Sequence, residues 1–189
     1  LVETEIDGEP LDRRHLLGTC FLLLLAGIDT TWSAIGSSLW HLATHPEDQA
    51  RLRAEPDLID SAVEELLRVY SPVTMAREVI ADVDVAGCPM KPGDKVLMSF
   101  PAANRDPAQF ENPDEFIIDR ERNRHVAFGS GIHRCLGSNL ARMELRVAIQ
   151  EWLTRIPTFE LADPAAVTWT GGQVRGPRTI PVRWSATQP

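Results

Sequence analysis

A cysteine within a glycine-rich segment is the strongest chemical feature of the sequence. Residues 128–137 read FGSGIHRCLG, and the two glycines at its start allow a tight backbone turn with positive φ. Cys135 follows this turn, where coil gives way to a helical pattern. Unpaired N–H groups and the positive end of the helix dipole favour a thiolate over a thiol at such a position. Because the N–H groups of Leu136 and Gly137 can hold that thiolate, the sequence predicts a charged sulfur ligand for a soft metal.

This segment resembles the cysteine-loop signature of the cytochromes P450, F-G-x-G-x-H-x-C-x-G, and matches it at every specified position. The alternative is a glycine-rich turn around a buried structural cysteine, which so many matched positions disfavour. The resemblance implies that Cys135 ligates the iron of haem b (iron protoporphyrin IX). It also implies that Phe128, Gly129 and Gly137 bind the cofactor.

Residues 26–31, AGIDTT, form a second chemical feature inside a long apolar helix. Glycine costs about 1 kcal/mol in a helix interior, and an aspartate in an apolar helix needs a partner. Gly27 lets another group approach closely, and Thr30 can hydrogen-bond a carbonyl of its own helix and admit water. Asp29 beside such a hydroxyl is a short proton relay. The same residue types form N-terminal caps, but the apolar helical pattern continues on both sides.

The AGIDTT segment resembles the distal-helix motif of the same family, A/G-G-x-D/E-T-T/S. The resemblance implies a catalytic role for Asp29 and Thr30, which would guide protons to iron-bound dioxygen. It further implies that Ala26 and Gly27 lie beside the haem.

Glu65 and Arg68 can pair on one face of a helix because residues three apart are neighbours there. Such pairs are often solvated, but the adjoining positions here are apolar, so this face is a candidate for burial. A buried pair of this kind specifies a fold rather than adding stability. The pair resembles the family's ExxR motif, whose third partner comes from the coil before the cysteine. Residues 104–107 and 116–120 are similar to that coil, and which residue completes the network stays open.

Two cationic side chains are candidates for the haem carboxylates. The resemblance places Arg77, just after the ExxR helix, and His133, two residues before the cysteine, on the haem propionates. Taken alone, each is equally consistent with a solvated surface residue. His125 is a weaker candidate for the same role.

Residues 120–146 contain six arginines and two glutamates, although the whole chain is acidic. A mixed-charge solvated surface is one interpretation. The other is a basic face over the thiolate that docks an acidic ferredoxin-type electron donor, with Arg105, Arg134 and Arg142 as members.

The composition narrows the class of protein. The chain has 189 residues with a formal net charge of −8 and 43% hydrophobic residues, which excludes a disordered tail or a disulfide-rich mini-protein. The acidic balance and scattered tryptophans argue against nucleic acid as a partner. The longest apolar run, residues 20–28, is far below the roughly 20 residues needed to span a bilayer, and the first residues lack a basic n-region. We therefore expect a cytoplasmic protein without a signal peptide or membrane segments.

The elements that must position these residues form a mainly α chain with small β-sheets, expected as one domain. A short polar helix is also expected at 46–54. In the tail, residues 167–169 and 180–184 are expected to form the two strands of a hairpin. The expected elements are a distal helix at 11–43, the ExxR helix at 57–70, a small sheet at 77–101, a meander and cysteine loop at 102–135, a final helix at 136–153 and a C-terminal hairpin at 165–185.

The resemblance covers nearly the whole chain and implies the fold and activity of a P450 monooxygenase. Such an enzyme inserts one oxygen atom of O2 into a small lipophilic organic substrate, with electrons from NAD(P)H through a redox partner. A peroxide-driven peroxygenase, which would not need the Asp29–Thr30 pair, is one alternative, and a non-catalytic fragment or binding module is another. The substrate pocket implied by the resemblance includes Leu25, Val73, Thr74 and Met75.

The chain departs from the family in length, since family members are roughly twice as long. We therefore expect the C-terminal half of a soluble bacterial-type member, whose N-terminal half would supply another propionate contact and part of the pocket wall. On its own the chain is expected to expose an apolar face along residues 16–31, to bind haem poorly and to be inactive.

Overall fold

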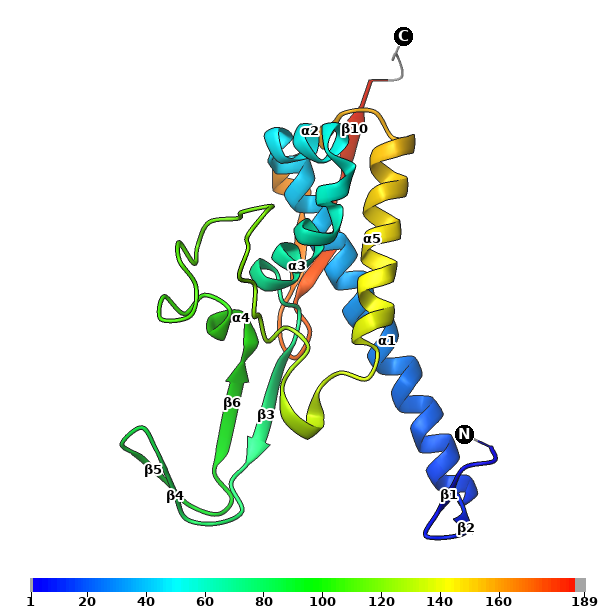
Figure 1. The fold of residues 1–189 in the computed structure, drawn as a ribbon, viewed down its shortest axis with the longest axis vertical. Helices are drawn as coiled ribbons and strands as arrows, with labels where there is room; N and C mark the ends of the chain where they lie inside the picture. The colour runs from blue at the N-terminus through cyan, green and yellow to red at the C-terminus, as the bar shows by residue number, and fades with distance from the viewer. Residues whose placement is uncertain (1, 186–189) are drawn as a thin grey trace.

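The computed structural model describes residues 2–185, and helices are its longest elements (Figure 1). The helices are α1 (Arg13–Thr44), α2 (Pro46–Ala54), α3 (Ile59–Val69), α4 (Phe100–Ala103) and α5 (Ser138–Arg155), with 3-10 turns at Pro56–Leu58, Gly131–His133 and Pro164–Ala166. The strands are β1 (Glu5–Ile6), β2 (Glu9–Pro10), β3 (Thr74–Glu78), β4 (Val83–Val85), β5 (Cys88–Met90), β6 (Lys95–Ser99), β7 (Phe159–Leu161), β8 (Thr168–Thr170), β9 (Gly176–Thr179) and β10 (Val182–Trp184).

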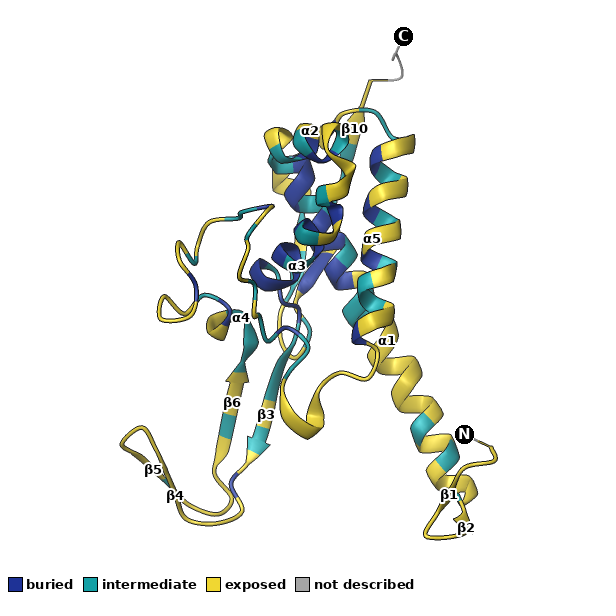
Figure 2. Cartoon of the chain, in the orientation of Figure 1, coloured by how far each residue is buried: buried dark blue, intermediate teal, exposed yellow. Residues whose placement is uncertain are grey.

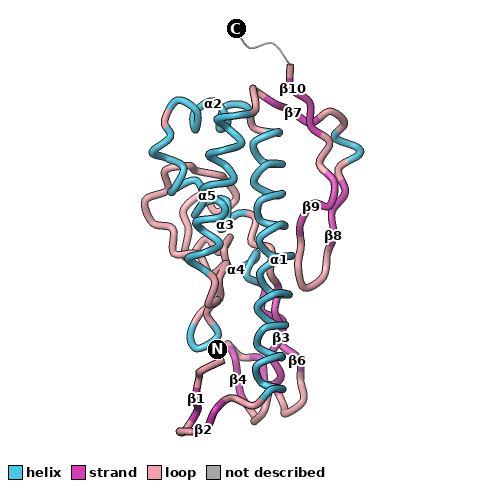
Figure 3. The backbone as a smooth tube through the Cα atoms, turned by 90° about the vertical axis from the view of Figure 1, so that its right-hand side faces the viewer, coloured by secondary structure: helices cyan, strands magenta, loops and turns pink. Residues whose placement is uncertain are grey.

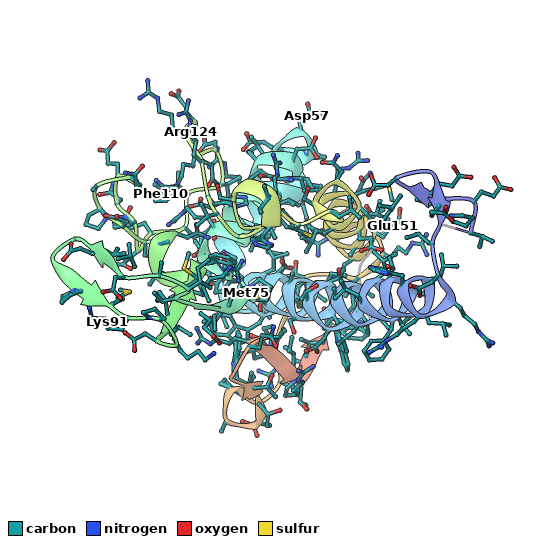
Figure 4. The ribbon with its side chains drawn as sticks, turned by 90° about the horizontal axis from the view of Figure 1, so that it is seen from below. Asp57, Met75, Lys91, Phe110, Arg124 and Glu151 are labelled. Atoms are coloured by element: carbon teal, nitrogen blue, oxygen red, sulfur yellow. The ribbon has the colours of Figure 1, made fainter. Side chains whose placement is uncertain are left out.

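The long helix α1 divides into an exposed first half and a packed second half. Asp12 caps its start by accepting a hydrogen bond from the His15 N–H. Large apolar side chains of the first half, such as Phe21 and Leu24, are more than half exposed, as expected for residues 16–31 (Figure 2). Seen from below, side chains on one flank of this half point outward with no other segment beyond them in that view (Figure 4). By length and composition alone α1 could cross a membrane, but a core helix of a soluble protein meets the same test.

The core lies where the second half of α1 meets α3 and α5. Leu42 of α1, Leu66 of α3, Leu145 and Ile149 of α5, and Phe159 of β7 are almost completely excluded from water. Burial of each such side chain contributes about 1.5–3 kcal/mol. These contacts fix the three helices relative to one another.

The sheets are all two-stranded and antiparallel among the described residues. In the first, β3 pairs with β6 from Thr74 opposite Ser99 to Glu78 opposite Lys95, so this sheet begins before the expected residue 77. Residues 100 and 101, expected at its end, belong to α4 instead.

The expected pairing within the C-terminal hairpin is wrong. Strand β8 pairs with β9, whereas β10 pairs with β7. The chain returns early because Gly172 adopts a positive φ of 110° between β8 and β9. Beyond β9 it reaches Pro181, which has no N–H for a ladder, and the Pro181 carbonyl instead accepts a hydrogen bond from Ala162.

The β8–β9 hairpin lies directly against α1 (Figure 3). A Cβ placed on Gly176 would lie 2.4 Å from the Cβ of Ser33, so only glycine permits this approach. One turn further along α1, a Cβ on Gly36 would lie 3.1 Å from the Pro177 ring. Small residues on both elements therefore bring β9 and α1 into close contact.

A buried charged network attaches the coil that follows α4 to helix α3. Arg68 is fully buried, and its Nε and one terminal nitrogen each donate to the Glu65 carboxylate at 2.8 Å. Its remaining N–H groups donate to backbone carbonyls of Asn104, Pro113 and Glu115 at 2.6–2.8 Å. All five guanidinium donors are thus used, and three of them hold the coil.

Glu65 collects further donors from the same coil. The Ile117 N–H, Arg120 Nε and Asn123 Nδ2 all donate to its carboxylate at 2.9–3.1 Å. Arg120 and Asn123 are therefore the coil side chains that complete the network, a point left open by the sequence. Burial by itself raises the pKa of Glu65, but the hydrogen bonds from Arg68, Ile117 and Arg120 outweigh it and leave the pKa below its usual range.

Substitution Glu65→Gln should destabilise the protein strongly, because it leaves the buried charges of Arg68 and Arg120 without their counter-charge. We expect the free energy of unfolding to fall by about 3–5 kcal/mol, measured by chemical denaturation. The matched control is Glu151→Gln, which removes an exposed i,i+4 pair with Arg155 and should change stability by less than about 1 kcal/mol. Equal losses in the two variants would contradict this role for Glu65.

Candidate functional site

The glycine-rich segment folds into a closed loop that ends at Cys135. Gly129 and Gly131 adopt φ values of 70° and 66°, the left-handed region that other residues rarely enter. The loop closes where the Cys135 N–H donates to the Phe128 carbonyl at 2.8 Å. Helix α5 begins at Ser138, two residues later than expected, with Gly137 at its N-cap. Two residues, Leu136 and Gly137, therefore separate the cysteine from the first residue of the helix.

The thiol of Cys135 is free and exposed. A Cβ on Gly137 would lie 3.9 Å from its Sγ, so glycine keeps that side of the sulfur open. The neighbouring apolar side chains are also exposed, Ile132 by 97% and Leu136 by 88%. An exposed thiol within an exposed apolar surface is suited to binding a large apolar group.

The second chemical segment lies within α1, which stays helical through it. The Thr30 hydroxyl donates to the Ala26 carbonyl at 2.6 Å. Nothing lies within 4 Å of where a Gly27 Cβ would be, so the helix surface is open at that position. No hydrogen bond or ion pair within residues 2–185 joins this segment directly to the Cys135 loop.

Asp29 has a partner that the sequence reasoning missed. Arg178 of β9 donates to Asp29 Oδ1 at 2.6 Å and to Oδ2 at 3.3 Å. This hydrogen bonding from Arg178 holds the pKa of Asp29 below its usual range. The two residues are 149 apart in the chain, and no local pattern connects them.

The expected propionate ligands have different surroundings. Arg77 lies on β3, half-buried, with one hydrogen bond from its guanidinium to the neighbouring Ala76 carbonyl. His133 is exposed at the end of its 3-10 turn. His125 is nearly buried, accepts a hydrogen bond from the Ala127 N–H at Nδ1 and bonds Glu64 through Nε2, and its weaker candidacy as a propionate ligand stays a prediction.

Glu64, one residue before the buried Glu65, supports the other side of the cysteine loop. Its carboxylate accepts from Arg142 Nε at 2.6 Å and bonds His125 Nε2 at 3.0 Å. The Arg142 guanidinium stacks over Phe128, 4.6 Å from the ring centroid. These contacts connect α3 and α5 to the first residue of the loop.

The expected basic face is less positive than the residue count suggests. Arg142 is paired with Glu64, and Arg105 is paired with Asp114 at 3.0 Å. Arg134 is exposed and, among the described residues, carries no such ion pair. Of the three arginines, only Arg134 retains an unneutralised charge within residues 2–185.

The expected pocket residues come from two segments. Leu25 is 60% exposed on α1. Val73 forms a β-bridge with Val174, and the Thr74 N–H donates to the Gln173 carbonyl at 2.9 Å. Met75 Sδ lies 3.7 Å from Nε2, the side-chain amide nitrogen of Gln173. The segment before β3 is thus bound to the turn of the β8–β9 hairpin.

The Glu64 cluster should make stability sensitive to acid. Burial raises the pKa of Glu64, but hydrogen bonds from His125 and Arg142 outweigh it and lower the pKa to about 2, from 4.5 in the unfolded chain. Its contribution is therefore present above pH 4.5 and is lost as the pH falls toward 2. We expect the unfolding midpoint of Glu64→Gln to fall less steeply over this range than that of the parent. The control Glu151→Gln should follow the parent, and a parallel curve for Glu64→Gln would rule the effect out.

Comparisons with known proteins identify the family of the chain. A family model described as Cytochrome P450 matches residues 1–162. Cytochrome P450 105C1 of a Streptomyces species is 47% identical over 178 residues, covering 92% of this chain and 47% of that protein. Vitamin D3 dihydroxylase of Streptomyces griseolus is 40% identical over 188 residues, covering 97% of this chain and 46% of that protein.

The fold agrees with solved structures of the same family. The crystal structure of cytochrome P450 CYP101C1 superposes with a TM-score of 0.93 at 42% identity, covering 98% of this chain and 48% of that one. The chain spans about half the length of the curated relatives it matches. Because the family model covers most of the chain and its fold is that of part of a P450, the chain belongs to the cytochrome P450 family.

Proposed function

We propose that the chain provides the iron ligand and the proton-handling residues of a haem-thiolate monooxygenase. The observation that carries this proposal is the exposed Cys135 thiol, held by a closed glycine loop within an exposed apolar surface. The enzyme would insert one oxygen atom of O2 into a small lipophilic substrate. Electrons would come from NAD(P)H through a ferredoxin-type donor.

The residues around Cys135 fit haem b. A flat apolar macrocycle needs an apolar surface beside its sulfur ligand, and Ile132 and Leu136 supply one. Its propionates need donors, which Arg77 and His133 can provide because their side chains are little used within the described residues. When bound, haem supplies the iron at which dioxygen is reduced.

The loop residues have separate roles in this proposal. Cys135 binds the iron, and Gly137 leaves space beside its sulfur. Gly129 holds the path of the loop through its positive φ of 70°, which other residues rarely adopt. Phe128 is held by Arg142 and would lie against the macrocycle.

Thr30 and Asp29 would move protons. The Thr30 hydroxyl hydrogen is committed to the Ala26 carbonyl, so its oxygen lone pairs are free to accept a hydrogen bond. Asp29 is partly exposed and can exchange protons with water. Asp29 would take up a proton, pass it on along the Thr30 side of the helix and return to its carboxylate form. Ala26 and the open position at Gly27 allow close approach of the cofactor.

The substrate and the redox partner are proposed by their chemistry. The exposed Leu25, with Val73, Thr74 and Met75, gives a mostly apolar lining that suits a lipophilic substrate. One relative is named for vitamin D3, a lipophilic molecule. Arg134, exposed next to Cys135 in the sequence, is the cation most available to an acidic donor. A cytoplasmic location accompanies this proposal.

Substitution Cys135→Ser should remove the thiolate signature of the holoenzyme expressed from the complete reading frame. We expect the Soret band of the reduced, carbon-monoxide-bound protein to leave the position typical of thiolate ligation. The matched control is Cys20→Ser, which changes another exposed free thiol and should leave the band in place. A thiolate-type band that persists in Cys135→Ser would refute the proposed function.

Substitution Thr30→Ala should uncouple oxygen consumption from product while the Soret band stays unchanged. We expect product formed per NAD(P)H to fall by about tenfold or more, because the variant loses the hydroxyl oxygen that would accept a hydrogen bond in the relay, and positioned proton transfer contributes at least about that much. Thr19→Ala is the control, since Thr19 makes the same bond to its own helix, at the His15 carbonyl, and should have little effect. Full coupling in Thr30→Ala, with hydrogen peroxide supporting turnover equally well, would favour the peroxygenase alternative.

A further inference from the structure

Arg178 makes three different contacts at the surface of α1. Its two terminal nitrogens bind both oxygens of Asp29, and its Nε donates to the Thr170 hydroxyl at 3.0 Å. Its guanidinium carbon also lies 5.7 Å from the centre of the Trp32 ring. Each contact fixes a different edge or face of the guanidinium, so its orientation is set.

The backbone that carries Arg178 is also fixed relative to Asp29. Gly176 and Pro177, the two residues before Arg178, pack directly on Ser33 and Gly36 of α1. The turn of the same hairpin is tied to the segment before β3, because the Arg175 N–H donates to the Pro72 carbonyl at 2.7 Å. The backbone that carries Arg178 is therefore held against α1 on the same side as Asp29.

This pair differs from the ordinary surface ion pairs of the chain. Arg183 and Glu160, for example, are each 64% exposed and meet at 2.8 Å, and within residues 2–185 this is the one hydrogen bond of the Arg183 guanidinium. Asp29 and Arg178 are only 36% and 32% exposed, and both carboxylate oxygens are engaged. A bidentate arginine–carboxylate pair of this kind gives directional control that a lysine point charge does not.

We propose that Arg178 is the positioning residue that orients the Asp29 carboxylate for proton delivery toward Thr30. This inference rests on the proposed function, because it assigns Arg178 to the same relay. Thr170 and Trp32 act through Arg178 by fixing its guanidinium. The β8–β9 hairpin is then part of the relay as well as of the fold.

The charge of Arg178 also sets the electrostatic environment of the Asp29 carboxylate. Within residues 2–185, Arg178 is the charged group bonded to Asp29, and the neighbouring Thr30, Trp32 and Thr170 are uncharged. Loss of Arg178 should therefore raise the pKa of Asp29 toward its ordinary value or above. The carboxylate would also lose the bidentate contact that fixes its orientation.

The test compares Arg178→Gln, Arg178→Lys and Thr170→Val with the parent holoenzyme. In Arg178→Gln we expect product per NAD(P)H to fall by about tenfold, a substrate Kd that changes by less than about twofold and an acid limb of the rate profile at higher pH. Thr170→Val should show the same change more weakly. Arg178→Lys should recover only part of the coupling, because it restores the charge without the bidentate geometry.

A second readout does not depend on turnover. Thermal unfolding of Asp29→Asn, Arg178→Gln and the double variant should give non-additive changes, because the pair couples the two sites. Arg183→Gln is the matched control and should leave coupling and pH profile unchanged.

The outcomes separate this inference from the proposed function. Unchanged coupling and pH profile in Arg178→Gln and Thr170→Val, with a normal thiolate spectrum, would overturn the role of Arg178 alone. If Arg178→Gln fails to fold, a parent-like pH profile and coupling in Thr170→Val and Arg178→Lys would overturn it equally. A thiolate spectrum that survives Cys135→Ser would instead overturn the proposed function.

Discussion

The buried ion pair between Glu65 and Arg68 is the interaction on which the position of the cysteine loop depends. Burying two charges is unfavourable unless every donor and acceptor is satisfied. Here the arginine uses all five donors, and three of them reach backbone carbonyls of the coil. The coil has little secondary structure of its own between α4 and the loop, so these bonds replace the ladder that a helix or sheet would provide. The pair therefore serves as the structural element that this segment lacks.

Helix α3 directs two consecutive glutamates to two different tasks. Glu65 faces the coil, whereas Glu64 faces α5 and holds His125 and Arg142 beside Phe128. The beginning of the cysteine loop is thus supported from the coil side and from the α5 side by one turn of one helix. A second polar link comes from Asn104, whose side chain accepts from the Val126 N–H and donates to Ser71. A fixed loop matters because its thiol is itself exposed, so the backbone of the loop must position it.

Local features of the sequence predicted much of this arrangement, whereas the sequence did not predict the long-range pairings. The glycine loop and the Glu65–Arg68 pair depend on neighbours within a few residues, which a spacing rule can identify. The partners of those residues come from other elements, as with Arg120 on Glu65 and Arg178 on Asp29. The predicted pairing of residues 180–184 with 167–169 failed for the same reason, because β10 pairs with β7, which precedes β8 in the chain. The strand that pairs with β8 is β9, whose close packing on α1 needs Gly176.

The proposed proton relay lies where α1 changes from an open surface to a packed core. Before Asp29 the helix presents large exposed apolar side chains, and after Thr31 it presents small buried ones such as Ser33 and Gly36. The small residues let β9 approach closely enough for Arg178 to reach Asp29. The open side begins at Gly27, where the helix surface is free of neighbours. A carboxylate at this boundary can be held by the protein on one side and reached by water on the other, which is what a residue that takes up and releases protons requires.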